Sequence, residues 1–161
     1  MRQLRSREEG FTLVELMVVV LIIAILIAIA VPTFLGGRVR AQNRAAQSDL
    51  RNALTAAKVY YSDNDTQDYA FGIADLLAVH ANLAFVAGNA PADGEVGFIT
   101  LDGTGGDADQ AVVFITRSRS GTWFCLLNEA VEPRAGTYYG ESSAGTGADL
   151  DTLAECVGGW S

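Results

Sequence analysis

The sequence predicts an α+β fold, in which a long N-terminal α-helix comes first and packs on a small antiparallel β-sheet. Three observations support this prediction: an uninterrupted apolar run at residues 11–31, apolar residues at helical spacing over 38–62, and short β-rich runs after residue 82. A helix followed by a group of strands is the order of an α+β layout. The 161 residues suffice for one such domain on a stem.

The apolar run predicts a membrane-spanning helix. Residues 11–31 contain a single ionisable side chain, Glu15. As a helix these residues measure about 30 Å, the thickness of the hydrocarbon core of a bilayer. The run has no polar face, which a helix on the surface of a soluble domain would show. We therefore expect a transmembrane segment over residues 11–35, behind a polar leader at residues 1–10.

A kink is predicted just beyond this run. Pro32 lacks an amide hydrogen and its ring clashes with the carbonyl four residues earlier, at Ala28. Gly36 and Gly37 each lower helix propensity by about 1 kcal/mol relative to alanine. Residues 28–37 should therefore be the softest part of the stem.

The stem continues as an amphipathic helix over residues 36–63, which should end at the turn-forming residues 62–65. Its apolar stripe has helical spacing and consists of Val39, Ala46, Leu50, Ala53, Ala57 and Tyr60. The small residues suit close packing against a sheet. Residues 38–58 carry a net charge of +4, which fits lipid headgroups, the acidic domains of neighbouring copies, or solvent.

Residues 64–161 predict a globular β-sheet domain. We expect a short helix at 73–80 and strands at the apolar, β-branched and aromatic runs 83–87, 96–101, 110–117 and 121–127. The last two runs are separated by a turn of hairpin length, which favours an antiparallel sheet. Residues 59–161 contain three arginines and fifteen carboxylates, and this net charge of −12 disfavours a nucleic-acid partner.

The two cysteines, Cys125 and Cys156, favour an extracytoplasmic disulfide. They lie too far apart in the sequence for a local CxxC redox or zinc motif. A bond closing a loop of this size stabilises a small domain by about 3 to 4 kcal/mol. Two unpaired buried thiols are the alternative.

The order of the leader and the apolar run indicates a cleavage that differs from that of a secretory signal peptide. A secretory signal peptide is cut after its apolar region, whereas here Gly10 stands immediately before that region. Gly10 followed by FTLVELMVVVLIIAILIAIAVP resembles the class III leader and stem of type IV pilins and pseudopilins, closely over residues 7–35. Beyond residue 62 the resemblance is one of layout, including a disulfide that bounds a C-terminal loop.

The resemblance implies processing and partners. A prepilin peptidase would cut after Gly10 and methylate the new amino terminus at Phe11. The precursor would lie in the cytoplasmic membrane among lipid, with its leader in the cytoplasm. An assembly platform and its ATPase machinery would then build a helical polymer with other copies at the cell surface. No cofactor is implied.

Glu15 has two interpretations. As a shallow carboxylate it favours the positive end of the helix dipole, by about 0.3 to 1 kcal/mol. The resemblance implies in addition that Glu15 pairs with the amine of Phe11 on a neighbouring subunit and sets axial register. The helix-interior glycine that many members of the family carry is replaced by Ala24.

Metal and enzyme sites receive little support. The acidic clusters at 63–68 and at Asp102, Asp107 and Asp109 do not match an EF-hand loop, although the second leaves a low-probability calcium site open. His80 is the single histidine, so a site of paired histidines is excluded. Known phosphate-binding and nucleophile motifs are also absent, and we expect no enzymatic activity.

Three functions are therefore compared. The chain is expected to be a pilin of a surface filament that serves adhesion, twitching motility or DNA uptake. The first alternative is a pseudopilin of a type II secretion or DNA-uptake system. The second alternative is a membrane-anchored binding domain that does not polymerise, but an anchor alone needs neither Gly10 nor Glu15 at its boundary.

Overall fold

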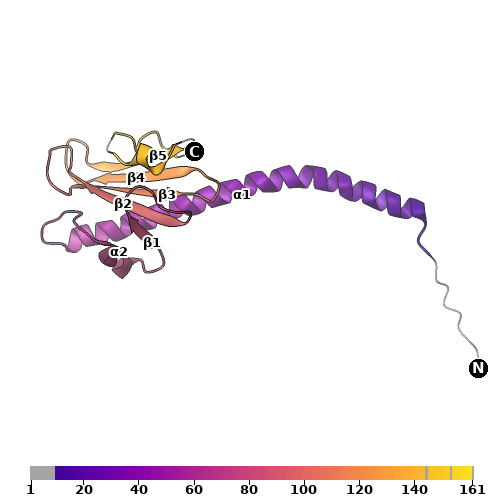
Figure 1. Ribbon diagram of the computed structural model, residues 1–161, viewed down its shortest axis with the longest axis horizontal. Helices are drawn as coiled ribbons and strands as arrows, with labels where there is room; N and C mark the ends of the chain where they lie inside the picture. The colour runs from indigo at the N-terminus through magenta and orange to yellow at the C-terminus, as the bar shows by residue number, and fades with distance from the viewer. Residues whose placement is uncertain (1–9, 144, 153, 161) are drawn as a thin grey trace, which may run out of the picture. The chain divides into compact units, whose positions relative to one another are not determined.

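The computed structural model describes residues 10–143, 145–152 and 154–160, without the side chains of residues 148 and 149 (Figure 1). The chain divides between Arg38 and Val39 into two compact units. The residues of the predicted leader before Gly10 lie outside the described part. The predicted boundaries at residues 35 and 63 remain expectations.

Helix α1 spans Leu13–Asp63 and passes through Pro32, Gly36 and Gly37. Its end at Asp63 agrees with the predicted end in the turn-forming cluster. Thr33 donates a side-chain hydrogen bond of 3.0 Å to the carbonyl of Ile29 beside Pro32. The kink at these residues stays a prediction.

In the second unit, α1 packs on the sheet through its alanine-rich stripe. Four of the six predicted stripe residues are buried, and Tyr60 is half-buried against the same core. Val39 does not belong to the buried stripe, because 45% of its surface is exposed. The buried stripe begins about two helical turns later, at Ala46. Leu54 and Ala56 also belong to it.

The sheet has five strands in the order β1-β2-β3-β4-β5. The strands are β1 Ala84–Ala87, β2 Glu95–Leu101, β3 Ala111–Arg117, β4 Trp123–Glu129 and β5 Gly136–Ser142. A short helix α2, Ile73–Val79, precedes β1, and a 3-10 turn η1, Gly147–Leu150, follows β5. The predicted short helix and four predicted strands are all present, with ends shifted by at most two residues. The hairpin joins β3 to β4 through Gly121, whose φ is +94°.

One pair of strands is parallel, which the sequence-based prediction of an antiparallel sheet missed. β1 pairs in parallel with β2, and the other three pairs are antiparallel. β1 has four residues, so the chain needs to return only about 10 Å, at ~3.3 Å per residue, before it enters β2. Gly97 permits this close approach, since a Cβ there would lie 2.4 Å from the carbonyl oxygen of Gly88.

β5 was not predicted at all. It forms seven residue pairs with β4, although two of its residues are glycines and its outward side chains are polar. Residues 136–142 are therefore held by the β4 ladder as well as by the disulfide.

Both faces of the sheet are covered, which explains why β3 and β4 are almost continuously apolar. Phe114, Phe124 and Leu126 pack on the face that α1 covers. On the other face, Val113, Ile115, Cys125 and Leu127 pack with residues of the C-terminal segment. Figure 1 shows the second half of α1 along one side of the sheet and the yellow C-terminal segment on the other.

Candidate functional site

The start of α1 carries a reciprocal hydrogen-bonded cap made by Thr12 and Glu15. The Thr12 amide and hydroxyl both donate to Oε2 of Glu15, at 2.9 and 2.6 Å. The Glu15 amide in turn donates to the Thr12 hydroxyl at 3.2 Å. This is a capping box, with Thr12 as N-cap and Glu15 three residues later, and it satisfies amide groups that the first helical turn leaves unpaired.

The capping box was foreseen only in part. The sequence predicted Glu15 at the positive end of the helix, and the spacing T-x-x-E is the signal that identifies the reciprocal pair. Oε2 of Glu15 is occupied, whereas Oε1 accepts no hydrogen bond from any residue in the described part of the chain. Glu15 is exposed, so this second oxygen is open to a partner outside the monomer.

The predicted processing residues stand just before this cap. Gly10 and Phe11 are both exposed and outside the helix. A Cβ on Gly10 would meet no atom within 4 Å, so the fold of the monomer does not require a glycine there. The backbone between these two residues is accessible.

The first part of α1 presents an apolar surface with no partner among the described residues of its own unit, 10–38. The large apolar residues from Leu13 to Leu35 are each about half exposed or more. α1 is long and apolar enough to cross a membrane, by length and composition alone. This surface needs lipid or other protein helices around it, since water disfavours so large an apolar area.

The cysteines form a disulfide, as predicted. Cys125 on β4 bonds to Cys156 with a Cα–Cα distance of 5.8 Å. Gly140 on β5 leaves room for it, because a Cβ there would lie 2.8 Å from Sγ of Cys125. The bond fixes the C-terminal segment over the outer face of the sheet.

Trp160 anchors the end of the described chain, and sequence reasoning did not single it out. Its Nε1 donates to the carbonyls of Cys125 and Gly140, each at 3.1 Å. Its ring packs on Tyr139 and Phe124, and the guanidinium of Arg51 lies 5.0 Å above it. An aromatic residue after a glycine-rich stretch is a weak signal, so only the fold reveals this role.

The acidic residues considered for calcium do not converge. Among the described residues, no group of three His, Cys, Asp or Glu side chains is placed to hold a metal ion. In the second cluster, Asp107 and Asp109 use their backbone carbonyls, which accept hydrogen bonds from Gly103 and Tyr69. His80 caps the end of α2, with its amide bonded to Leu76, and is half-buried.

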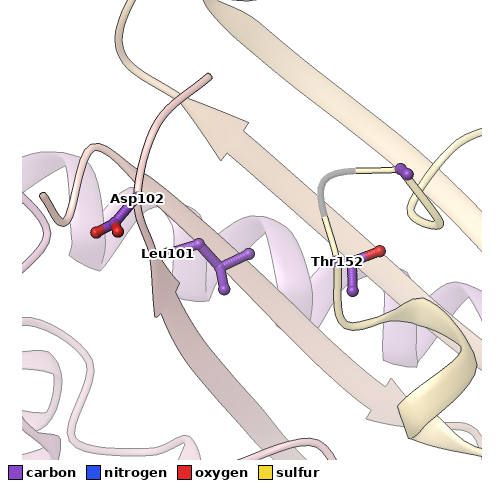
Figure 2. Close-up of a pocket in the computed structure, with 4 residues that line it drawn as sticks. Leu101, Asp102 and Thr152 are labelled. Atoms are coloured by element: carbon purple, nitrogen blue, oxygen red, sulfur yellow. The ribbon is translucent and has the colours of Figure 1, made fainter. Parts of the chain in front are cut away.

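A shallow pocket of about 320 Å³ lies between the end of β2 and the C-terminal segment. It is lined by Leu101, Asp102, Thr152 and Ala154. In Figure 2, Leu101 and Thr152 point into the space between them, while the carboxylate of Asp102 points away from it.

Comparisons with known proteins agree with the N-terminal geometry. The model of the prokaryotic N-terminal methylation motif matches residues 5–31. The type IV major pilin PilA of Myxococcus xanthus is 46% identical over 37% of this chain and 27% of its own length. The type II secretion system core protein G of Pectobacterium carotovorum is 31% identical over 63% of this chain and 65% of its own. No solved structure gave a significant match.

The chain thus spans less than two thirds of these two relatives. It spans more of a fimbrial protein of Pseudomonas aeruginosa, which is 34% identical over 76% of this chain and 87% of its own length. The methylation motif, the apolar stem behind it and this long match lead to one assignment. The chain belongs to the family of type IV pilins and type II secretion pseudopilins.

Proposed function

We propose that the chain is a structural subunit of a type IV pilus or a related extracytoplasmic filament. The observation that carries the proposal is the junction at the start of α1. There, an accessible Gly10–Phe11 bond and a capped carboxylate adjoin a long apolar surface that has no partner in its own unit.

The N-terminal residues receive these roles. Prepilin peptidase cuts after Gly10 and methylates the new amino group of Phe11. Glu15 then pairs with that amino group on a neighbouring subunit. In an apolar filament core an unpaired carboxylate is costly, so one charge pair at this position favours a single axial register. The open Oε1 supports this role, because the capping box uses only Oε2.

The apolar surface of the first part of α1 has one role before filament assembly and another during it. Before assembly the apolar helix holds the precursor in the cytoplasmic membrane among lipid. During assembly, driven by a platform and its ATPase, the helix exchanges lipid for neighbouring helices. Residues 28–37 around Pro32, Gly36 and Gly37 are the part of the stem that bends or unwinds in the process. The role is structural and involves no catalysis.

A pseudopilin is the second candidate, and the match to a secretion core protein over 63% of this chain favours it. The disulfide between Cys125 and Cys156 favours the pilin, because it fixes the C-terminal segment by a covalent bond. The long match to a fimbrial protein supports the same choice. A non-polymerising anchored domain would have no use for the accessible Gly10 junction beside the cap.

The test is to isolate filaments from cells that produce the chain. Filaments sheared from the surface are examined by electron microscopy, and their subunits by mass spectrometry. We expect filaments containing this chain, beginning at methylated Phe11. A chain that remains in the membrane and never appears in filaments, or that retains residues 1–10 there, would contradict the proposal.

A further inference from the structure

Four basic residues lie along one flank of α1. Arg40, Arg44, Arg51 and Lys58 are spaced by 4, 7 and 7 residues, and all four are exposed. At 100° per residue these spacings keep the four side chains within about 40° of one another around the helix axis. We call this row the basic flank. It extends over about 27 Å, at ~1.5 Å per residue.

The contacts of Arg51 and Tyr60 show which side of the domain the basic flank occupies. Arg51 covers the ring of Trp160, whose Nε1 bonds to carbonyls of β4 and β5. Tyr60 lies on the other side of the buried stripe, where its hydroxyl donates to the carbonyl of Ala70, ahead of α2. The basic flank therefore faces the β5 side of the domain.

The basic flank has no ionic partner within its own chain, as far as the structure describes it. The ion pairs between described residues join Arg117 to Asp93 at 3.5 Å and Arg134 to Glu129 at 3.9 Å. Arg51 lies over the ring of Trp160, and none of the four cations has an ionic partner among the described residues, so the basic flank can meet a negatively charged surface outside the monomer.

Such a surface exists on the same domain at the end of α1, far along the helix from Arg40 and Arg44. The loops at 63–68 and 102–109 lie together, because the Tyr69 amide donates to Asp109 at 2.7 Å and the Gln110 side chain donates to the carbonyl of Gln67 at 3.0 Å. We call these two loops the acidic end. Asp63, Asp65 and Asp107 are exposed on them. Their carboxylates do not gather around one metal position in the described chain, so they present a spread of charge.

We propose that the basic flank docks the acidic end of a second copy of this chain. This inference rests on the proposed function, because it specifies which surfaces of neighbouring subunits meet. The two surfaces differ, so a contact in which each copy offers its basic flank to one neighbour and its acidic end to another is heterologous. Such a contact, repeated without closing a ring, adds subunits and builds an open filament, as the proposed function requires.

An anionic membrane surface is the competing partner, and the arrangement disfavours it. A lipid surface would attract every cation near the apolar run, including Arg38. Arg38 points about 160° away from Arg40 around the helix and is not part of the basic flank. Concentration of the charge on one long flank, as far as Lys58, suits a protein surface that runs beside the helix.

The experiment reverses the two charges nearest the start of the second unit in the full-length chain. We expect Arg40→Glu with Arg44→Glu to lower the yield of sheared filaments by about tenfold, since two attractive pairs become repulsive. The matched control is Arg38→Glu, which reverses one charge on the same helix but on another side and should leave the yield unchanged. Both positions are exposed, so protease resistance of the domain should equal that of the unmodified chain.

Restoration of charge complementarity is the second arm. Adding Asp65→Arg and Asp107→Arg to the Arg40→Glu, Arg44→Glu chain should restore at least about half of the lost filaments. Two results would overturn the inference and leave the proposed function standing. One is a normal filament yield from the Arg40→Glu, Arg44→Glu chain, and the other is no recovery of filaments when Asp65→Arg and Asp107→Arg are added. A loss with Arg38→Glu as large as with the pair would identify a membrane surface instead and also overturn it. If the unmodified chain forms no filaments, the proposed function fails and the inference fails with it.

Discussion

Leu21 and Leu126 show how differently two regions of this chain use the same kind of side chain. Leu21, in the first half of α1, has 60% of its surface exposed, whereas Leu126, in β4, is fully buried. The second unit buries its leucines and phenylalanines between α1, the sheet and the C-terminal segment. The described residues of the first unit, 10–38, contain no element besides α1 that could bury its own. Its apolar surface is therefore completed by lipid or by other copies, at about 25 cal/mol per Å² removed from water.

This difference separates two kinds of mutational effect. In the second unit, stability comes from burial, strand pairing and a disulfide within one chain. In the first unit, the polar atoms that matter most belong to Thr12 and Glu15, and their use depends on neighbours. Substitutions in the first unit should therefore change assembly without changing the stability of the domain, whereas substitutions of buried residues in the second unit should lower the stability of the domain.

The largest expected effect is the loss of filaments on replacing Glu15. Glu15→Ala removes the carboxylate from the capping box and from the proposed pair with Phe11, while the β-sheet domain is untouched. We expect membrane insertion, cleavage after Gly10 and thermal unfolding of the domain to be unchanged, and filaments to be absent by electron microscopy. Glu15→Gln is the matched variant, because it retains an oxygen acceptor for Thr12 and loses only the charge. Normal filaments from either variant would remove the charge pair from the mechanism.

The next effect concerns the disulfide in the second unit. Replacing Cys125 and Cys156 together by alanine should lower the free energy of unfolding by about 3 to 4 kcal/mol, the chain-entropy value for a loop closed over a separation of 31 residues. Chemical denaturation measures this loss. Limited proteolysis should then cut within residues 143–160, because β5 remains paired to β4. First cuts inside 136–142 would show that the ladder does not hold β5 by itself.

The smallest effect is a pH dependence at Tyr69. Burial, helped by the neighbouring Tyr61, raises the pKa of Tyr69 to about 12. Because an unfolded tyrosine has a pKa near ~10, the folded state keeps this proton to higher pH. The associated stability is complete below about pH 10 and decreases as the pH rises through about 12, by roughly 2 kcal/mol in all.

Tyr69→Phe provides the control for this pH dependence. The tyrosine hydroxyl donates to Oδ1 of Asn128, which is buried on β4. Removing the donor should cost about 1 to 3 kcal/mol at neutral pH and flatten the decline between pH 10 and 12. Thermal unfolding of both proteins across that range measures the difference. Equal slopes would assign the alkaline loss to other groups.

Much of the fold was predictable because the relevant signals are local. The alanine-rich stripe, the turn after residue 62 and the hairpin at Gly121 each depend on residues close together in the sequence. The missed features depend on distant partners. β5 has two glycines and is recognisable only beside β4, and the parallel β1–β2 pair depends on the space left by Gly97. The exposure of Val39 likewise reflects where the sheet begins to cover α1.

The candidate site divides in the same way. Gly10, Phe11 and Glu15 lie within six residues at the start of the apolar run, so the sequence alone identifies them. The length of the run, which predicts a membrane-spanning helix, is also read directly from the sequence. Tertiary structure alone placed Trp160 beneath Arg51 and joined two aspartate-rich loops into the acidic end. The physical reason is how far apart along the chain the interacting residues lie. Helix length and capping are set by neighbours in the chain, whereas charge complementarity and burial depend on surfaces that only folding brings together.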